Sequence, residues 1–295
     1  MAQCGGWGSW LLAGLLGISA ATMGAQERVQ AKRADGHETP LMIYRAAKRS
    51  NGSAVCAPLA VISHGAGGSE KGYRYLAETM ASLGYTAVVM GHAESGMDAL
   101  ASGMRADGIR KGVKTLVADP AAEEARLEDV GAALQWANSQ CRAPFRVLLG
   151  HSMGAETVML EAGAKPAIVV PDAGKNRFDA YVALSPEGPG VVFVDGAWKG
   201  IRRPMLILTG TRDQAVNGGP ETRQVPFHEM PGARGQCQWQ GVIDGATHMN
   251  FAGMGMGARG VEQRVQATVA TFLRGVRGGG CLLPDGSGGM QITAK

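Results

Sequence analysis

The sequence predicts an α/β fold: one domain with a mostly parallel central sheet of about eight strands, flanked by helices, without a large cap domain. Continuous apolar runs of strand length, at 58–65 and 86–92, are the first observation, because strands covered on both faces are apolar throughout. The second is the helical periodicity between such runs, which parallel strands require for their crossovers. No internal repeat or long linker divides residues 26–277, which favours a single domain.

Residues 1–25, before this domain, have the pattern of a secretory signal peptide. The segment WLLAGLLGISAATMGA is an apolar stretch of suitable length followed by small residues, and it is too short to span a bilayer comfortably. No Lys or Arg precedes it, so a buried N-terminal helix is the alternative. We expect a secreted or periplasmic protein with no stable membrane insertion after cleavage.

Two short edge strands are expected first, at 28–33 and 41–44, because the turn-like segment ADGHETP separates them. A helix then connects the two buried strands. Ser69 is a suitable residue to cap its start and Gly84 to end it in a left-handed turn. Its apolar face consists of Leu76, Met80 and Leu83.

The alternation of strand and helix continues to the end of the domain. Asp119 and Pro120 form an N-cap and first-turn pair for a helix with Leu127, Val130 and Leu134 on one face. A further helix is expected at 153–162. The remaining buried strands are expected at 146–149, 179–185, 204–210 and 239–245. The inner side of a final helix carries Val261, Val265, Val269, Phe272 and Leu273.

Two segments depart from this alternation. Residues 93–118 are polar, contain glycine and are only partly helical in pattern, so we expect a small lid over the top of the sheet. The Gly-rich tail, 278–295, is expected to be loosely ordered apart from an anchor at Cys281.

Composition and charge exclude several classes of protein. Hydrophobic residues at 45% and charged residues at 18% fit a globular protein, and 45 glycines imply many tight turns. The net charge of +4 is spread along the chain, and the cluster IRKGVK lacks aromatic stacking residues beside it. We therefore expect no nucleic-acid partner.

The cysteines fit an exported protein. Removal of Cys4 with the signal peptide leaves an even set, Cys56, Cys141, Cys237 and Cys281, which allows two disulfides in any of three pairings. Four buried thiols are the alternative if the leader is retained. No Cys or His cluster has zinc spacing, so we expect no metal.

Ser152 is the candidate nucleophile. It lies in GHSMG, residues 150–154, which matches the G-x-S-x-G nucleophile elbow directly after a buried strand and before a helix. The alternative without chemistry is that this segment is only a Ser/Gly start of a helix. A serine hydroxyl needs a base, and His248 follows the last expected strand in DGATHMNF.

The acid of a triad is expected between these two residues in the chain. Asp213 follows the strand at 204–210 and fits that order. Glu187 in LSPEGPG and Asp244 are the competing carboxylates. A triad at the carboxyl ends of parallel strands lies where open α/β sheets build their sites.

The oxyanion of the tetrahedral intermediate needs backbone N–H donors. We assign the amides of Met153, at the start of a helix, and Ala66, in HGAGGS after the first buried strand. His64 is structural or lines the substrate pocket, because it precedes the nucleophile. Gly67 and Gly68 do not indicate a phosphate loop, since no Lys-Ser/Thr pair follows.

Five segments, spread over 58–251, together resemble the α/β-hydrolase superfamily, and within it the chlorophyllase or predicted dienelactone hydrolase-like group, which is related to bacterial polyester hydrolases and platelet-activating-factor acetylhydrolases. They are VISHGAGGSEKGYRYLAETMASLGY, GHSMGAE, ALSPEGPG, LILTGTRD and DGATHMNF.

The resemblance implies cofactor-independent hydrolysis of carboxylic esters, small or polymeric, through an acyl-enzyme on Ser152, Asp213 and His248. Dienelactone hydrolases proper use a cysteine nucleophile, so the serine argues against that substrate. The usual strand order of this fold favours two disulfides, Cys56–Cys141 at the bottom of the sheet and Cys237–Cys281 at the tail.

The substrate pocket is expected to be an accessible cleft for short to medium acyl groups. Its candidate lining residues are His64, Phe193, Trp198, Met153, Met254 and Met256. Acyl transfer or amide cleavage on the same triad is the alternative chemistry. A non-catalytic binding protein on the same scaffold is a further alternative, although no triad member is missing.

Overall fold

The computed structural model describes residues 1, 26–45, 56–232, 235–282, 286 and 288–295. Residues 2–25 of the expected signal peptide lie outside the described residues. Within the described part of the chain, no helix is long and apolar enough to cross a bilayer.

Nine strands form one sheet in the order β1-β2-β4-β3-β5-β6-β7-β8-β9. The strands from β3 to β8 are parallel to one another, whereas β1 and β2 at one edge and β9 at the other are antiparallel to their neighbours. The expected mostly parallel α/β sheet is confirmed. The strands are β1 (Gln26–Lys32), β2 (Glu38–Tyr44), β3 (Leu59–Ser63), β4 (Thr86–Met90), β5 (Arg146–His151), β6 (Ala180–Leu184), β7 (Met205–Arg212), β8 (Gln238–Thr247) and β9 (Met290–Ala294).

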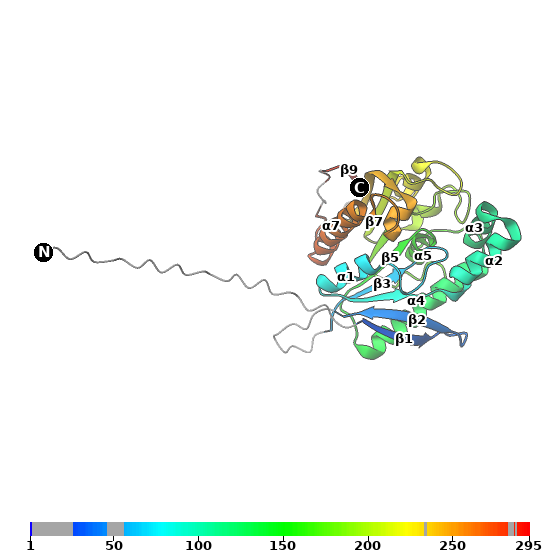
Figure 1. Cartoon of the computed structure of the whole chain (residues 1–295), viewed down its shortest axis with the longest axis horizontal. Coiled ribbons are helices and arrows are strands. Elements are labelled where there is room, and N and C mark those ends of the chain that lie inside the picture. The colour runs from blue at the N-terminus through cyan, green and yellow to red at the C-terminus, as the bar shows by residue number, and fades with distance from the viewer. Residues whose placement is uncertain (2–25, 46–55, 233–234, 283–285, 287) are drawn as a thin grey trace.

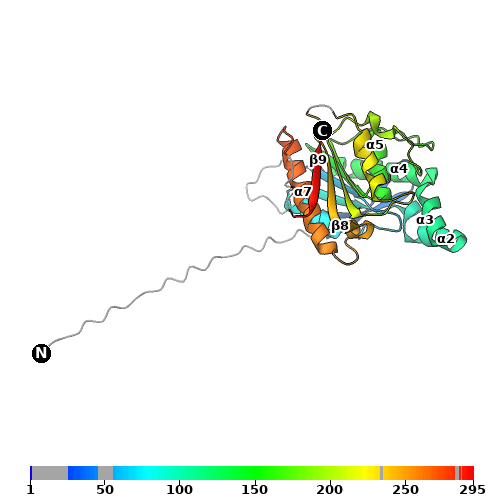
Figure 2. The ribbon, with the colours of Figure 1, turned by 90° about the horizontal axis from the view of Figure 1, so that it is seen from above.

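Helices cover both faces of the sheet. On one face α1 (Arg74–Ser82) and α7 (Ala258–Arg277) pack their apolar residues over the strands, including the five predicted for the final helix. On the other face lie α4 (Pro120–Gln140) and α5 (Met153–Ala162). Figure 2 shows α7 and α5 on opposite sides of β8. No separate cap domain occurs among the described residues.

The register of the central strands fixes where the following loops begin. Ser63 at the end of β3 is paired with Gly150 of β5, and His151 is paired with Leu184 of β6. The three chain segments that leave these strands therefore start at the same level of the sheet. This arrangement gathers loops from distant parts of the sequence at the carboxyl edge.

One of the two predicted N-caps is confirmed. The Asp119 side chain accepts a hydrogen bond from the amide of Ala121 at 3.0 Å, as its N-cap role requires. The prediction that Ser69 caps α1 is wrong, because residues 69–72 form a turn and the helix begins after Tyr73, whose φ is 53°. Gly84 has φ 87° at the end of that helix, as expected.

The segment 93–118 is more helical than its sequence suggests. It contains a short 3₁₀ turn, η1 (Ala93–Ser95), followed by α2 (Met97–Asp107) and α3 (Ile109–Val117). Gly103 and Gly112 let the two helices approach so closely that a Cβ on Gly112 would overlap the backbone of α2. Figure 1 shows this helical hairpin at one side of the molecule.

The tail also differs from the expectation of loose order. Residues 290–294 form β9, which pairs antiparallel with β8 from Trp239 to Ile243 and brings the strand number to nine. The remaining short helical elements are α6 (Val225–Glu229), η2 (Ala197–Gly200), η3 (Pro220–Gln224) and η4 (His248–Ala252).

Two disulfides join the four cysteines of the described residues as the resemblance implied. Cys56 is bonded to Cys141, and Cys237 to Cys281, with Cα–Cα distances of 5.6 and 5.2 Å. Disulfides persist in extracellular and periplasmic compartments, so this pairing fits a protein of such a compartment.

Candidate active site

Ser152 occupies the sharp turn between β5 and α5. Its backbone has φ 57° and ψ −124°, a conformation that residues with a Cβ rarely adopt. The flanking glycines are required by space, because a Cβ on Gly150 would overlap the Gly154 carbonyl and a Cβ on Gly154 would overlap the Ser63 carbonyl. The amide of Ser152 donates to the Leu184 carbonyl at 3.0 Å, which ties the turn to β6.

A continuous chain of hydrogen bonds joins Ser152, His248 and Asp213. His248 begins η4 directly after β8, and its Nε2 lies 3.0 Å from Ser152 Oγ. Its Nδ1 lies 3.1 Å from Oδ1 of Asp213, which follows β7. The His248 side chain is 26% exposed and that of Asp213 is fully buried. The structure thus brings together the three residues that the sequence predicts as a triad.

Polar groups surround the carboxylate of Asp213 on both oxygens. Ser185 Oγ donates to Oδ1 and Thr209 Oγ1 donates to Oδ2, each at 2.9 Å, and Arg223 Nε lies 2.8 Å from Oδ1. Burial by itself raises the pKa of Asp213. The hydrogen bond from His248 and the positive charge of Arg223 outweigh burial and hold the pKa below its usual value. Asp213 is therefore an ionised partner for the imidazole.

Ser185 and Arg223 were not predicted as members of this site. Ser185 ends β6 with φ 53°, and its Oγ lies 2.6 Å from Nδ1 of His248. In the segment ALSPEGPG, the sequence indicates Glu187 as a candidate acid, and Glu187 lies two residues after this serine. Arg223 lies in η3 and donates to the carbonyls of Ser185 and Pro186 at 2.9 and 3.0 Å. No sequence pattern indicates that an arginine from this distant turn returns to the site.

The two competing carboxylates have other partners. Glu187 forms an ion pair with Arg223 at 3.0 Å and accepts from the amide of Val216. Asp244 is exposed and accepts from Thr211 Oγ1 at 3.1 Å. Within the described part of the chain, the carboxylate hydrogen-bonded to His248 is that of Asp213.

The loop after β3 packs directly against the turn that carries Ser152. A Cβ on Gly65 would lie 3.1 Å from the Cβ of Ser152. The amide of Gly67 donates to Ser95 of η1 at 2.8 Å, so the helical segment 93–118 supports this loop. Among the described residues, the amides of Ala66 and Met153 have no hydrogen-bond acceptor. The Met153 amide is also the first of α5, where the helix dipole favours negative charge.

His64 is fully buried below this loop. Its Nδ1 lies 2.6 Å from the carbonyl of Gly65, and its Nε2 accepts from the amide of His92 at 3.1 Å. Burial is the main reason that the pKa of His64 is well below its usual value, so the ring is neutral. Of the two expected roles, the contacts fit the structural one, and a buried ring cannot line a pocket.

The predicted aromatic pocket residues belong to the core. Phe193 and Trp198 have no exposed surface, lie 5.1 Å apart between ring centroids, and Trp198 Nε1 donates to the sulfur of Met159. The prediction that they contact substrate is wrong, because side chains sealed by their neighbours are out of reach of a ligand. Met153 is buried likewise, whereas Met254 and Met256 are exposed.

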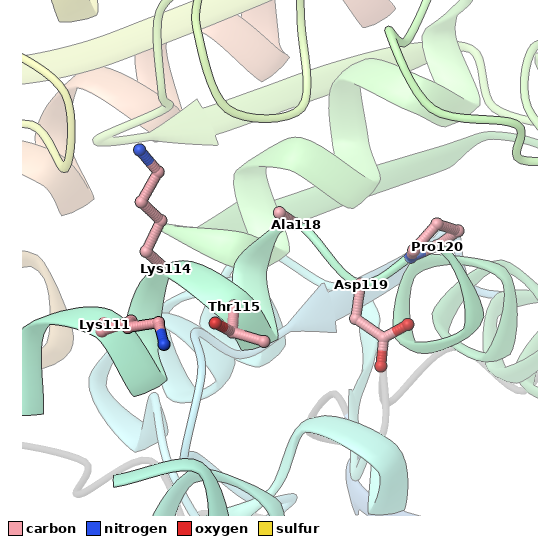
Figure 3. A pocket seen from close by; sticks show the side chains of 6 residues that line it. All are labelled: Lys111, Lys114, Thr115, Ala118, Asp119 and Pro120. Atoms are coloured by element: carbon pink, nitrogen blue, oxygen red, sulfur yellow. The ribbon is translucent and has the colours of Figure 1, made fainter. Parts of the chain in front are cut away.

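A surface hollow lies away from these residues. It has a volume of about 580 Å³ at the junction of α3 and α4, and Figure 3 shows its lining residues: Lys111, Lys114, Thr115, Ala118, Asp119 and Pro120. None of the candidate site residues lines it. Within the described residues, no group of three or more His, Cys, Asp or Glu side chains is arranged to hold a metal ion.

Among the comparisons with known proteins, those with solved structures support the architecture described above. No protein-family profile and no curated protein sequence matches the chain. Among solved structures, it is similar to an esterase from Thermogutta terrifontis, with 22% identity and a TM-score of 0.59 over 88% of this chain and 97% of that one.

Two further structures are similar at comparable levels. A putative dienelactone hydrolase from Klebsiella pneumoniae has 17% identity and a TM-score of 0.58 over 83% of this chain and 98% of that one. An esterase from Pyrococcus furiosus has 16% identity and a TM-score of 0.55 over 85% and 92%. At this identity the likeness shows the fold, and the chain has the α/β-hydrolase fold that was expected.

Proposed function

We propose that this α/β-hydrolase-fold protein is an exported serine hydrolase that cleaves carboxylic esters through an acyl-enzyme. The observation that carries the proposal is the unbroken hydrogen-bond chain from Ser152 Oγ through His248 to the buried, ionised Asp213. Esterases among the similar structures support the choice of substrate class. The two disulfides support export.

Acylation begins with attack of Ser152 Oγ on the ester carbonyl carbon. Nε2 of His248 takes the hydroxyl proton as the Oγ–C bond forms, and the carbonyl π electrons move to the oxygen. Asp213 stabilises the resulting imidazolium through Nδ1. The amides of Ala66 and Met153 donate to the oxyanion, and one such donor contributes about 3 kcal/mol to the barrier reduction.

Collapse of this intermediate breaks the bond to the leaving oxygen. His248 returns its proton to that oxygen, the alcohol departs, and Ser152 carries the acyl group. Water then attacks the acyl carbon while His248 accepts one of its protons. The second collapse releases the carboxylic acid and restores Ser152.

Hydrolysis of p-nitrophenyl acetate, butyrate and octanoate by the wild type, Ser152→Ala and His248→Ala tests the proposal. We expect turnover of the short to medium esters, and a loss of about 10⁴-fold or more in kcat for each variant, because triad members act as a unit. Labelling of the wild type, and not of Ser152→Ala, by a fluorophosphonate identifies the nucleophile. Turnover retained by Ser152→Ala would reject the mechanism.

Two further assays distinguish ester hydrolysis from the alternative reactions, acyl transfer and amide cleavage. Addition of methanol separates hydrolysis from acyl transfer, since a transferase converts the acyl group to its methyl ester in preference to the acid. Peptide p-nitroanilides test amide cleavage. For export, sequencing of the N-terminus of protein recovered outside the cytoplasm is expected to show removal of residues 1–25.

A further inference from the structure

We propose that Tyr73 and His151 are positioning residues that form a one-way hydrogen-bond relay between the oxyanion loop and the loop that carries His248. The proposal rests on the proposed function, since it assigns a role in the same site. It concerns two buried groups outside the chain of Ser152, His248 and Asp213.

The relay touches three loops that leave three different strands. The amide of Gly65, after β3, donates to the Tyr73 hydroxyl at 3.2 Å. That hydroxyl lies 2.7 Å from Nδ1 of His151, the residue before Ser152 at the end of β5. Nε2 of His151 lies 3.0 Å from the backbone carbonyl of His248, after β8.

The two ends of the relay fix the direction of every bond in it. The Gly65 amide can only donate, so the Tyr73 oxygen accepts from it and has its single proton free to donate to Nδ1 of His151. The His248 carbonyl can only accept, so Nε2 of His151 must carry the ring proton. One tautomer of a neutral His151 satisfies both contacts, whereas a ring protonated on both nitrogens would leave the proton of the Tyr73 hydroxyl without an acceptor in this chain of bonds.

The surroundings keep His151 in that neutral state. Tyr73 and His151 are 8% and 3% exposed, and the His151 ring centroid lies 4.7 Å from that of His248. Burial and the nearby His248 hold the pKa of His151 well below its usual value, and Arg223 lowers it further while Asp213 opposes this shift. When His248 becomes an imidazolium during catalysis, its neighbour therefore adds no second positive charge.

The relay fixes the positions of the separate loops relative to one another. The sheet fixes the strand ends but not the backbone beyond them, and displacement of a reacting group by about 1 Å costs about 10²-fold in rate. Gly65 immediately precedes the oxyanion donor Ala66, and the carbonyl contacted by His151 belongs to the base itself. A single chain of bonds thus holds the oxyanion donor and the base in register with the nucleophile turn.

Three variants separate the steps of the relay. Tyr73→Phe removes the hydroxyl, His151→Gln keeps an N–H donor near the Nε2 position but loses the Nδ1 acceptor, and His151→Phe removes both. The matched control is Tyr75→Phe. Tyr75 lies in the first turn of α1, which Tyr73 precedes. Its hydroxyl donates to a backbone carbonyl of η4, that of Phe251, at 2.9 Å, and makes no hydrogen bond to Gly65 or His151.

We expect kcat on p-nitrophenyl butyrate to fall about tenfold in Tyr73→Phe and about 100-fold in His151→Phe, with KM within about twofold of wild type. His151→Gln should lie between wild type and His151→Phe, and its combination with Tyr73→Phe should be far less harmful than the product of the two effects. Tyr75→Phe should stay within about twofold in kcat. Complete labelling of Ser152 by a fluorophosphonate verifies that each variant is folded.

The tautomer of His151 is measured independently of activity by ¹⁵N–¹H correlation spectra at pH 7, assigned with the His151→Gln variant. We expect a neutral ring with the proton on Nε2. A proton on Nδ1, or a charged ring, would overturn the relay even in an inactive protein. If the wild type hydrolyses esters but Tyr73→Phe matches Tyr75→Phe in kcat, the positioning role is wrong while the proposed function stands.

Discussion

Nε of Arg223 lies 2.8 Å from Oδ1 of Asp213, and neither side chain has more than 1% of its surface exposed. The arginine comes from η3, ten residues beyond the aspartate, and also contacts Glu187. Asp213 is therefore both the acid partner of His248 and one half of a buried ion pair. A change at Arg223 therefore affects both the stability of the fold and the partner of His248.

Arg223→Gln is expected to lower stability by about 3 kcal/mol, because it leaves buried carboxylates unpaired. Loss of the positive charge also raises the pKa of Asp213. The acidic limb of kcat/KM should move to higher pH, since ionised Asp213 is then lost earlier as pH falls. Arg177→Gln, which breaks the ion pair with Glu161 at 2.7 Å, is the control and should leave that limb unmoved. A parallel shift in both variants would contradict the assignment.

Asp213→Asn is expected to lower kcat by about 10⁴-fold, because an amide favours the wrong tautomer of the imidazole. Glu187→Gln, which alters the other partner of Arg223, should lower kcat by less than about tenfold. Steady-state kinetics on one ester compare the two directly. A larger loss for Glu187→Gln would identify Glu187 as the acid.

Ser185→Ala is expected to lower kcat about fivefold, which corresponds to loss of one hydrogen bond of about 1 kcal/mol. The direct contact between His248 and Asp213 remains in this variant. Thr209→Val is the matched change, since it removes a hydroxyl from the other oxygen of Asp213, and it should affect kcat less. Equal losses would mean that the contact of Ser185 with His248 is irrelevant.

Gly154→Ala is expected to lower the free energy of unfolding by more than about 3 kcal/mol or to prevent folding, because its Cβ would overlap the Ser63 carbonyl. Gly260→Ala is the control in another helix, α7, where the nearest side-chain neighbour of a new Cβ is the end of Arg264 at 3.5 Å. There alanine should stabilise by about 0.5–1 kcal/mol. Urea unfolding measures both, and a stable Gly154→Ala would refute the packing argument.

Glu123→Gln is expected to change the dependence of stability on pH. Glu123 is fully buried, and burial raises its pKa to about 7, although Arg126 lowers it. The unfolded value is about 4.3, so the folded protein binds more protons between these values and loses stability as pH rises through that window. The variant should be more stable than wild type by about 2 kcal/mol at pH 8 relative to pH 5.

Urea unfolding at the two pH values measures this difference. Glu124→Gln, a partly exposed neighbour on α4, is the control and should show no comparable change between them. A Glu123→Gln effect that is the same at pH 5 and pH 8 would show that the buried charge is not its cause.

The elements that the sequence predicts well are those whose signal is local. An unbroken apolar run marks a strand covered on both faces, and Ser152, Asp213 and His248 each lie just after a strand that the sequence predicts. Ser185 and Arg223 have no local sequence signal, because their contribution to the site depends on which distant groups the fold brings beside them. The prediction that Phe193 and Trp198 contact substrate is wrong for the same reason. An aromatic residue near a strand end has the same sequence signature in a core and in a pocket. The assignment of the Ala66 and Met153 amides as oxyanion donors rests on chain position and stays a prediction.

The pairing of residues 290–294 with β8 affects whether other protein chains in solution can pair with this edge of the sheet. β8 leads directly to His248, and without a partner its outer edge would offer a row of free amides and carbonyls to any extended chain. β9 satisfies that edge from Trp239 to Ile243. A short segment from a glycine-rich region thereby covers the edge of the strand that precedes His248 and protects the protein from edge-to-edge aggregation there.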